Sequence, residues 1–174
     1  RTPEVMPRGV NCADEFTPML DSADVLVVGP GLGQSHWSLQ LLQLALATGK
    51  PLLLDADALN MLAAGMLGGG RLVANWVLTP HPGEAARLLA CTTTVVQADR
   101  FAAVGALQQR YGGVIVLKGN GTLISGGGDT LLSDYGNPGM ASGGMGDVLS
   151  GVIGALLAQH LAPLQAAALG VCLH

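Results

Sequence analysis

Residues 137–151 read NPGMASGGMGDVLSG, a glycine-rich stretch with a single acidic residue, Asp147, that runs into an apolar segment. The pattern predicts a loop followed by a helix over residues 145–159. The first turn of a helix carries unpaired N–H groups and about half a positive charge. Glycines let the backbone approach a ligand closely. We therefore expect an anion-binding loop, with Asp147 in the first turn of the helix.

This arrangement suits phosphoryl transfer. The N–H groups of Gly143, Gly144 and Met145 are expected to face the charge that develops on a phosphoryl group, and Asp147 is expected to act as a base toward a substrate hydroxyl. The alternative is a flexible loop in which Asp147 only interacts with the helix dipole. The residues of this stretch alone leave both interpretations open.

The composition indicates one α/β domain spanning residues 1–174. Of the residues, 49% are hydrophobic, 3% are aromatic and 11% are charged, so the core is built from Leu, Val, Ile and Ala. Such a core is typical of buried parallel strands covered by helices. The net charge of −4, with no cluster of Lys or Arg, argues against a nucleic-acid partner.

The cysteines and the apolar regions indicate a cytoplasmic protein that is not embedded in a membrane. Cys12, Cys91 and Cys172 are isolated from one another, which is typical of free thiols in a reducing compartment. The chain opens without a signal-peptide pattern. Polar residues interrupt residues 148–173, so this segment predicts two buried helices rather than a membrane span.

Strand and helix patterns alternate along the chain. Strands are expected within 23–28, 51–54, 71–78 and 113–125, with a hairpin tip at 126–129 and a returning strand over TLLS. Helices are expected over 35–47, after residue 55, from about residue 83, over 97–110 and over 145–159. This alternation predicts a mostly parallel sheet.

Polar loops follow the ends of these strands. In an open parallel sheet such loops gather along one edge, where ligands bind. We therefore expect one composite site built from five loops: Gly29–Gln34, Asp55–Asn60, Thr79–Glu84, Lys118–Thr122 and Asn137–Asp147.

Two of these loops have ambiguous chemistry. Asp55 and Asp57 lie at a strand end, where they could hold Mg²⁺ or cap the following helix. GPGLGQS (29–35) has the spacing G-x-G-x-G rather than the dinucleotide-binding G-x-G-x-x-G, so it predicts a loop that approaches a ligand closely rather than a Rossmann site.

Two further loops carry candidate binding side chains. His81 lies between two prolines and is expected to be exposed, where it could contact a substrate or serve only the fold. Glu84 begins a helix, where an acid stabilises the dipole. Lys118 lies at a strand end beside Gly119, which fits either nucleotide phosphates or a simple hairpin turn; no Walker motif occurs in the chain.

Taken together, several stretches resemble the ADP-dependent NAD(P)H-hydrate dehydratase family, which in bacteria often forms the C-terminal half of a bifunctional repair enzyme. The resemblance covers about Pro3 to His174, and the T-P-H-P-G-E loop makes it more specific than G-G-M-G-D alone. It implies a ribokinase-like, three-layer fold with a mostly parallel central sheet. The stretches are, in order, VVGPGLGQS, LLLDADALNML, LTPHPGEAARLL, VIVLKGNGTLI and GNPGMASGGMGDVLSGVIGALLAQ.

The resemblance implies a lyase that repairs a hydrated nicotinamide cofactor, NADHX or NADPHX. The ring hydroxyl would be phosphorylated by ADP, with ATP as a possible donor and Mg²⁺ assisting. Phosphate would then leave to restore NAD(P)H, with AMP as the other product. The resemblance also implies a homo-oligomer.

The family's motifs further imply roles for individual residues. Asp147 falls at the catalytic and substrate-binding acid, and Gly33 and His81 fall at substrate contacts. No metal ligands can be assigned. The nucleotide-binding positions implied are Lys118, Gly119, Asn120, Gly121, Thr122 and Gly146.

The chain departs from the family at its two ends. The family begins with a further strand and glycine-rich region before Arg1, and its C-terminal helix continues beyond His174, so we expect a fold truncated at both ends. Two other functions stay open: a ribokinase-like kinase of a small vitamin-precursor alcohol, and a non-catalytic nucleotide-binding module.

Overall fold

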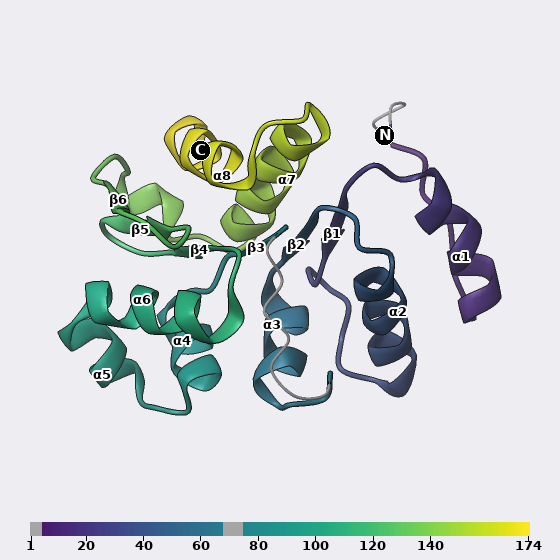
Figure 1. Ribbon diagram of the computed structural model, residues 1–174, viewed down its shortest axis with the longest axis horizontal. Helices are drawn as coiled ribbons and strands as arrows, with labels where there is room; N and C mark the ends of the chain where they lie inside the picture. Colours follow the sequence, from purple (N-terminus) through teal and green to yellow (C-terminus); the bar gives the residue numbers. More distant parts are fainter. Residues whose placement is uncertain (1–4, 68–74) are drawn as a thin grey trace.

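The computed structural model describes residues 5–67 and 75–174, and its centre is a sheet of six strands in the order β1-β2-β3-β4-β5-β6 (Figure 1). The first four strands are parallel; β5 runs antiparallel to β4, and β6 runs antiparallel to β5. The expected mostly parallel sheet is therefore confirmed. The strands are β1 (Leu26–Val28), β2 (Leu52–Leu54), β3 (Trp76–Leu78), β4 (Val114–Leu117), β5 (Thr122–Ser125) and β6 (Thr130–Ser133).

Helices cover both faces of this sheet, in three layers (Figure 1). Because β1 to β4 follow one another in a single direction, right-handed crossovers place the helices that link them on one face. These are α2 (His36–Ala47), α3 (Ala56–Ala63), α4 (Pro82–Leu89), α5 (Thr93–Ala98) and α6 (Arg100–Tyr111), with α1 (Ala13–Ser22) packed beside α2. The other face carries α7 (Met145–Ala158) and α8 (Pro163–Leu173).

Alternate side chains of each strand enter two separate hydrophobic cores. Leu54 and Leu78 pack on the side of α2 to α6, whereas Leu53 and Val77 pack on the side of α7 and α8. All four side chains are fully buried. Both faces of these strands are thus apolar, which explains the short continuous hydrophobic runs in the sequence.

Most of the predicted helices are confirmed, with two differences. The helix expected over 97–110 begins instead at Arg100, because Asp99 caps it by accepting a hydrogen bond from the N–H of Ala102 at 2.8 Å, and the separate helix α5 precedes it. Helix α1 has no counterpart in the prediction. Part of the strand expected within 71–78 falls on residues 71–74, outside the described residues; the strand itself spans Trp76–Leu78.

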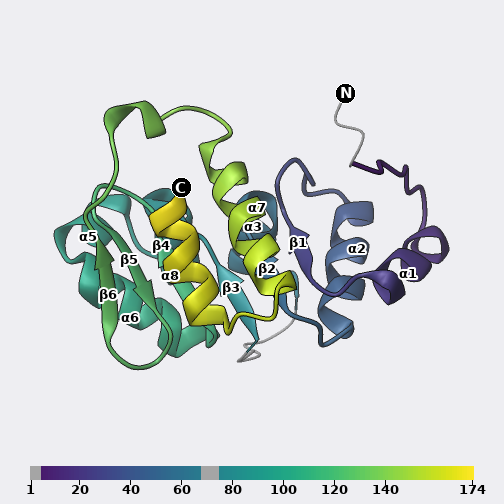
Figure 2. The ribbon, with the colours of Figure 1, turned by 90° about the horizontal axis from the view of Figure 1, so that it is seen from above.

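The segment between β6 and α7 leads from the edge of the sheet into the glycine-rich stretch and the start of α7. Figure 2 shows it leaving the β6 edge and returning to α7, which packs against β1 and β2. It contains a short 3₁₀ turn, Pro138–Met140. The two buried helices expected within 148–173 are confirmed as α7 and α8. No helix among the described residues combines the length and the apolar character needed to cross a membrane.

Candidate active site

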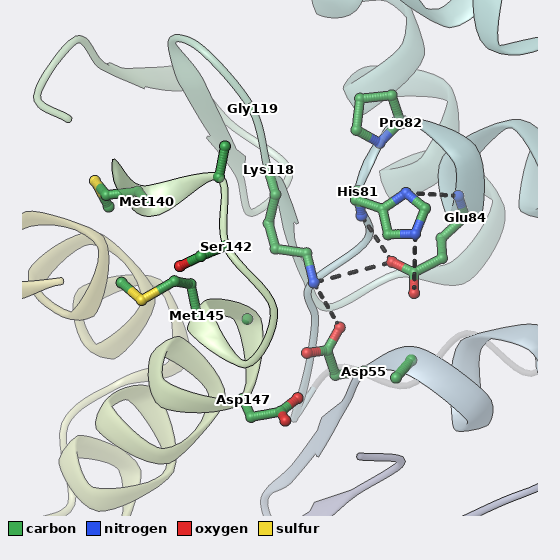
Figure 3. Close-up of a pocket in the computed structure, with 13 residues that line it drawn as sticks. Asp55, His81, Pro82, Glu84, Lys118, Gly119, Met140, Ser142, Met145 and Asp147 are labelled. Atoms are coloured by element: carbon green, nitrogen blue, oxygen red, sulfur yellow. Dashed lines mark hydrogen bonds and ion pairs between the residues drawn. The ribbon is translucent and has the colours of Figure 1, made fainter. Parts of the chain in front are cut away.

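A cavity of about 390 Å³ lies at the carboxyl ends of β2, β3 and β4 (Figure 3). The structure brings four of the five predicted loops together around it; the Gly29–Gln34 loop contributes no lining residue. The lining residues are Asp55, Ala56, His81, Pro82, Glu84, Lys118, Gly119, Met140, Ala141, Ser142, Met145, Gly146 and Asp147.

Asp55 is buried at the base of this cavity, directly after β2, with only 1% of its surface exposed. One carboxylate oxygen, Oδ1, accepts a hydrogen bond from Lys118 Nζ at 2.8 Å. The other, Oδ2, accepts one from Ser150 Oγ at 2.9 Å. A buried carboxylate needs such partners, because loss of water around the charge is costly. Asp55 therefore joins β2 to β4 and α7.

Of the two roles proposed from the sequence for Asp55, the helix cap is wrong, whereas Mg²⁺ binding stays a prediction. Asp55 occupies the N-cap position of α3, but its side chain makes no capping hydrogen bond. Asp57 is engaged elsewhere, since its Oδ2 accepts a hydrogen bond from the N–H of Gly33 at 2.8 Å. Within residues 5–67 and 75–174, no group of three or more His, Cys, Asp or Glu residues could hold a metal ion.

Lys118 lies between two carboxylates. Besides Asp55, its Nζ lies 3.9 Å from Oε2 of Glu84, a residue that is also buried. The same Oε2 accepts a hydrogen bond from the backbone N–H of His81 at 2.8 Å. Two negative charges thus share one ammonium group at the base of the cavity. The sequence indicated only a dipole role for Glu84 and missed this contact.

His81 caps helix α4 and also lines the cavity. Its Nδ1 accepts hydrogen bonds from the N–H groups of Gly83 at 3.0 Å and Glu84 at 3.4 Å. An accepting Nδ1 has no proton, so the neutral ring carries its proton on Nε2, which lies 3.5 Å from Glu84 Oε1. The side chain is 51% exposed, as the sequence suggested. Its substrate contact stays a prediction.

The start of α7 presents an acid and free N–H groups to the cavity. Its N-cap, Gly144, has a φ of 88° and provides no capping side chain. The N–H of Met145 bonds weakly to the carbonyl of Ser142 at 3.4 Å. Among the described residues, no group accepts a hydrogen bond from the N–H of Gly146 or of Asp147. The carboxylate of Asp147 is exposed and also has no partner among these residues. Figure 3 shows this carboxylate pointing toward the Asp55 side of the cavity.

The predicted anion-binding glycines lie at or beside the cavity. Gly143 and Gly144 precede its lining residues Met145 and Gly146. At Gly146 a Cβ would lie 3.2 Å from Lys118 Nζ and 3.6 Å from Asp55 Oδ2. Glycine at this position therefore allows the helix to approach the Lys118–Asp55 ion pair closely.

Arg100 holds the turn that follows β4. Its Nη2 donates to the carbonyl groups of Leu117 at 3.1 Å and Gly121 at 2.9 Å. Gly119, with a φ of 141°, packs against the guanidinium so closely that a Cβ there would collide with it. Burial lowers the pKa of Arg100 from its usual value. No sequence motif indicated this role.

The remaining residues predicted to bind nucleotide or substrate do not line the cavity. Asn120, Gly121 and Thr122 continue the turn that begins at Lys118, and Thr122 Oγ1 donates to the carbonyl of Gly119 at 3.1 Å. Gly33, with a φ of 73°, is fixed by Asp57. The structure thus links the Gly29–Gln34 loop to the residues that follow Asp55.

Comparison with known proteins identifies what the chain resembles. The sequence model described as NAD(P)H-hydrate dehydratase matches residues 1–174. A bifunctional NAD(P)H-hydrate repair enzyme from Coxiella burnetii is 50% identical over 117 residues, covering 67% of this chain and 23% of that protein. The chain thus spans about a quarter of the length of this relative.

Two solved structures share the fold. A ribokinase-like superfamily protein from Enterococcus faecalis aligns with a TM-score of 0.79 at 32% identity, over 91% of this chain and 55% of that one. An ADP/ATP-dependent NAD(P)H-hydrate dehydratase from Bacillus subtilis, co-crystallised with ATP and Mg²⁺ and soaked with CoA, aligns with a TM-score of 0.73 at 33% identity, over 85% and 53%. The expected ribokinase-like fold is confirmed.

Proposed function

Because the chain belongs to the NAD(P)H-hydrate dehydratase family, we propose that its cavity catalyses the ADP-dependent dehydration of NADHX or NADPHX to NAD(P)H, with release of AMP and phosphate. One observation of the site geometry supports this proposal. The exposed carboxylate of Asp147 lies in the first turn of α7, in a cavity that also contains Lys118 and adjoins unpaired N–H groups. A base and an electropositive cradle are the two elements that phosphoryl transfer to a hydroxyl requires.

In the first step, Asp147 orients the hydroxyl on the reduced ring and accepts its proton. The hydroxyl oxygen forms a bond to the β-phosphorus of ADP, and the bond from that phosphorus to the oxygen shared with AMP breaks. AMP leaves with that electron pair. We propose that the N–H groups of Gly143, Gly144 and Met145 stabilise the negative charge on the transferred phosphoryl group. Those of Gly146 and Asp147 are also free to do so.

In the second step, the ring loses the phosphate. The C–O bond breaks, phosphate leaves with its electron pair, and the neighbouring ring carbon gives up a proton to solvent water, which restores the double bond of NAD(P)H. Gly33 and His81 are proposed to hold the substrate during both steps. His81 is suited to this because Glu84 and the capping N–H groups fix its ring.

The adenine nucleotide is proposed to bind along residues 118–122 and Gly146, with ATP as a second possible donor. Mg²⁺, when bound, neutralises phosphate oxygens; it keeps several water ligands and is commonly held by substrate phosphates. The described residues fit that mode, since they offer no protein cage of three or more acidic, His or Cys ligands. We further propose that the chain forms one domain and that the protein is a homo-oligomer. We also propose that it works in the cytoplasm, in keeping with its free cysteines.

The direct test is to incubate the purified protein with NADHX, ADP and Mg²⁺ and to follow the absorbance of restored NADH. We expect NADH, AMP and phosphate in equal amounts. Accumulation of a stable phosphorylated alcohol would indicate a kinase instead. Nucleotide binding without turnover, with either ADP or ATP, would indicate a binding module.

A further inference from the structure

Three structural elements meet at Asp55. The residue follows β2, its Oδ1 binds Lys118 after β4 at 2.8 Å, and its Oδ2 binds Ser150 on α7 at 2.9 Å. Asp55 and Ser150 are almost completely inaccessible to water, so solvent cannot replace either contact. The arrangement connects the two sides of the cavity through one buried carboxylate.

The start of α7 has few other polar attachments. Its N-cap, Gly144, offers no side chain, and the loop residues 141–144 are exposed. Ser150 lies three positions after Asp147, so the two residues are neighbours on adjacent turns of the helix. Among the described residues, Ser150 makes the side-chain hydrogen bond that joins the first two turns of α7 to the sheet.

We infer that Asp55 is a positioning residue that sets the place of Asp147 through Ser150, and the place of the turn after β4 through Lys118. The inference rests on the proposed function, because it assigns Asp147 a reaction to perform. A small displacement of a reacting group lowers the rate even where binding is unchanged. A tether one helical turn from that group therefore has its main effect on turnover.

The chemistry of the contact favours positioning over simple stabilisation. A buried ion pair contributes little net stability, because losing water around both charges offsets their attraction. Hydrogen bonds to a charged acceptor are, however, stronger than those between neutral groups. Asp55 accepts two of them from opposite sides of the cavity, which fixes the distance between those sides.

The test compares two buried serines in the repair reaction. Ser150→Ala removes the tether, and we expect kcat to fall roughly 10- to 100-fold while the KM for ADP changes less than about 3-fold. Ser133→Ala is the matched control: Ser133 is buried on β6, outside the cavity, and its hydroxyl has no partner among the described residues. Its kcat should equal that of the unmodified protein.

A second comparison asks whether Ser150 acts through Asp147. In an Asp147→Asn background, adding Ser150→Ala should leave the residual rate unchanged, since residues that act as a unit are not additive. Asp55→Asn should retain more of kcat than Asp55→Ala, because an amide can still bind both Ser150 and Lys118. A further loss of rate when Ser150→Ala is added to Asp147→Asn, or equal kcat for the two Asp55 variants, would overturn the inference.

A readout independent of turnover separates this inference from the proposed function. Hydrogen–deuterium exchange of the amides at residues 148–151 should be faster in Ser150→Ala than in the unmodified protein, and unchanged in Ser133→Ala. Equal exchange rates in the two variants would show that Ser150 does not tether the start of α7. If the unmodified protein does not restore NADH, the proposed function is wrong. The exchange measurement still decides whether Ser150 tethers α7.

Discussion

Two carboxylates border the same cavity under opposite conditions. Asp55 is buried, with Lys118 and Ser150 bound to its two oxygens. Asp147 is exposed at the start of α7, with no partner among the described residues. A buried charge must be paired to be tolerated, whereas a base must keep its oxygens free for the substrate. The contrast supports the roles that we propose, in which Asp55 holds the site in place and Asp147 takes part in the reaction.

The sharpest test of this contrast is Asp147→Asn. We expect kcat to fall by roughly 10²- to 10⁴-fold, the range for loss of a general base. Nucleotide affinity, measured by calorimetry with ADP, should stay close to its original value. Near-normal turnover by this variant would exclude Asp147 as the base.

Asp55→Ala, by contrast with Asp147→Asn, should lower the stability of the fold. Removing one partner of a buried ion pair leaves the other charge unpaired, and we expect the free energy of unfolding to fall by about 3 kcal/mol. This is the lower end of the usual range, since the Lys118 side chain keeps 19% of its surface exposed. Urea denaturation measures the loss. Asp147→Asn is the control and should unfold like the unmodified protein.

A smaller effect is expected for Arg100, whose hydrogen bonds hold the turn after β4. Arg100→Lys replaces a planar fork that reaches two carbonyl groups by a single ammonium group. Loss of one charge-assisted hydrogen bond of about 1.4 kcal/mol corresponds to a roughly 10-fold higher KM for ADP. Arg110→Lys, at the exposed end of α6, is the control. An unchanged KM in both variants would mean that the turn does not need Arg100.

The smallest effect concerns His81, whose capping of α4 and proposed substrate contact can be separated. His81→Ala removes the N-cap of α4 and should lower the free energy of unfolding by about 1 kcal/mol, measured by urea denaturation. His81→Asn should retain that stability, because Asn is a good N-cap, yet it lacks the ring. If His81 contacts the substrate, both variants raise the KM for NADHX. If neither variant raises the KM for NADHX and only His81→Ala lowers the free energy of unfolding, His81 serves only to cap α4.

The sequence predicted the elements of the site better than the contacts between them. Strand ends and helix starts follow from local patterns, so four loops around the cavity could be anticipated. The partners of Asp55 could not, because Lys118 and Ser150 lie 63 and 95 positions away in the chain. An acid after a strand fits a metal site, a helix cap or an ion pair equally well, and only the packing of β4 and α7 reveals the ion pair with Lys118 and the hydrogen bond from Ser150.

Other misses have similar causes. Ser150 carried a weak signal, as a polar residue within an apolar helix one turn from Asp147. Arg100 carried none, since its partners are carbonyl groups, which every residue has. The break between α5 and α6 at Asp99 was predictable in principle, because Asp is a strong N-cap, but the hydrophobic pattern runs across it.

The order of elements along the chain has a consequence for biosynthesis. Helices α7 and α8 follow all six strands, and they alone among the described helices pack on the face that includes Leu53 and Val77. On the ribosome, where N-terminal parts emerge first, residues 145–173 reach that face only after the six strands have been made. The same helix then delivers both the cover and Asp147. Synthesis therefore adds the apolar cover of that face and the residue that we propose as the base in a single step.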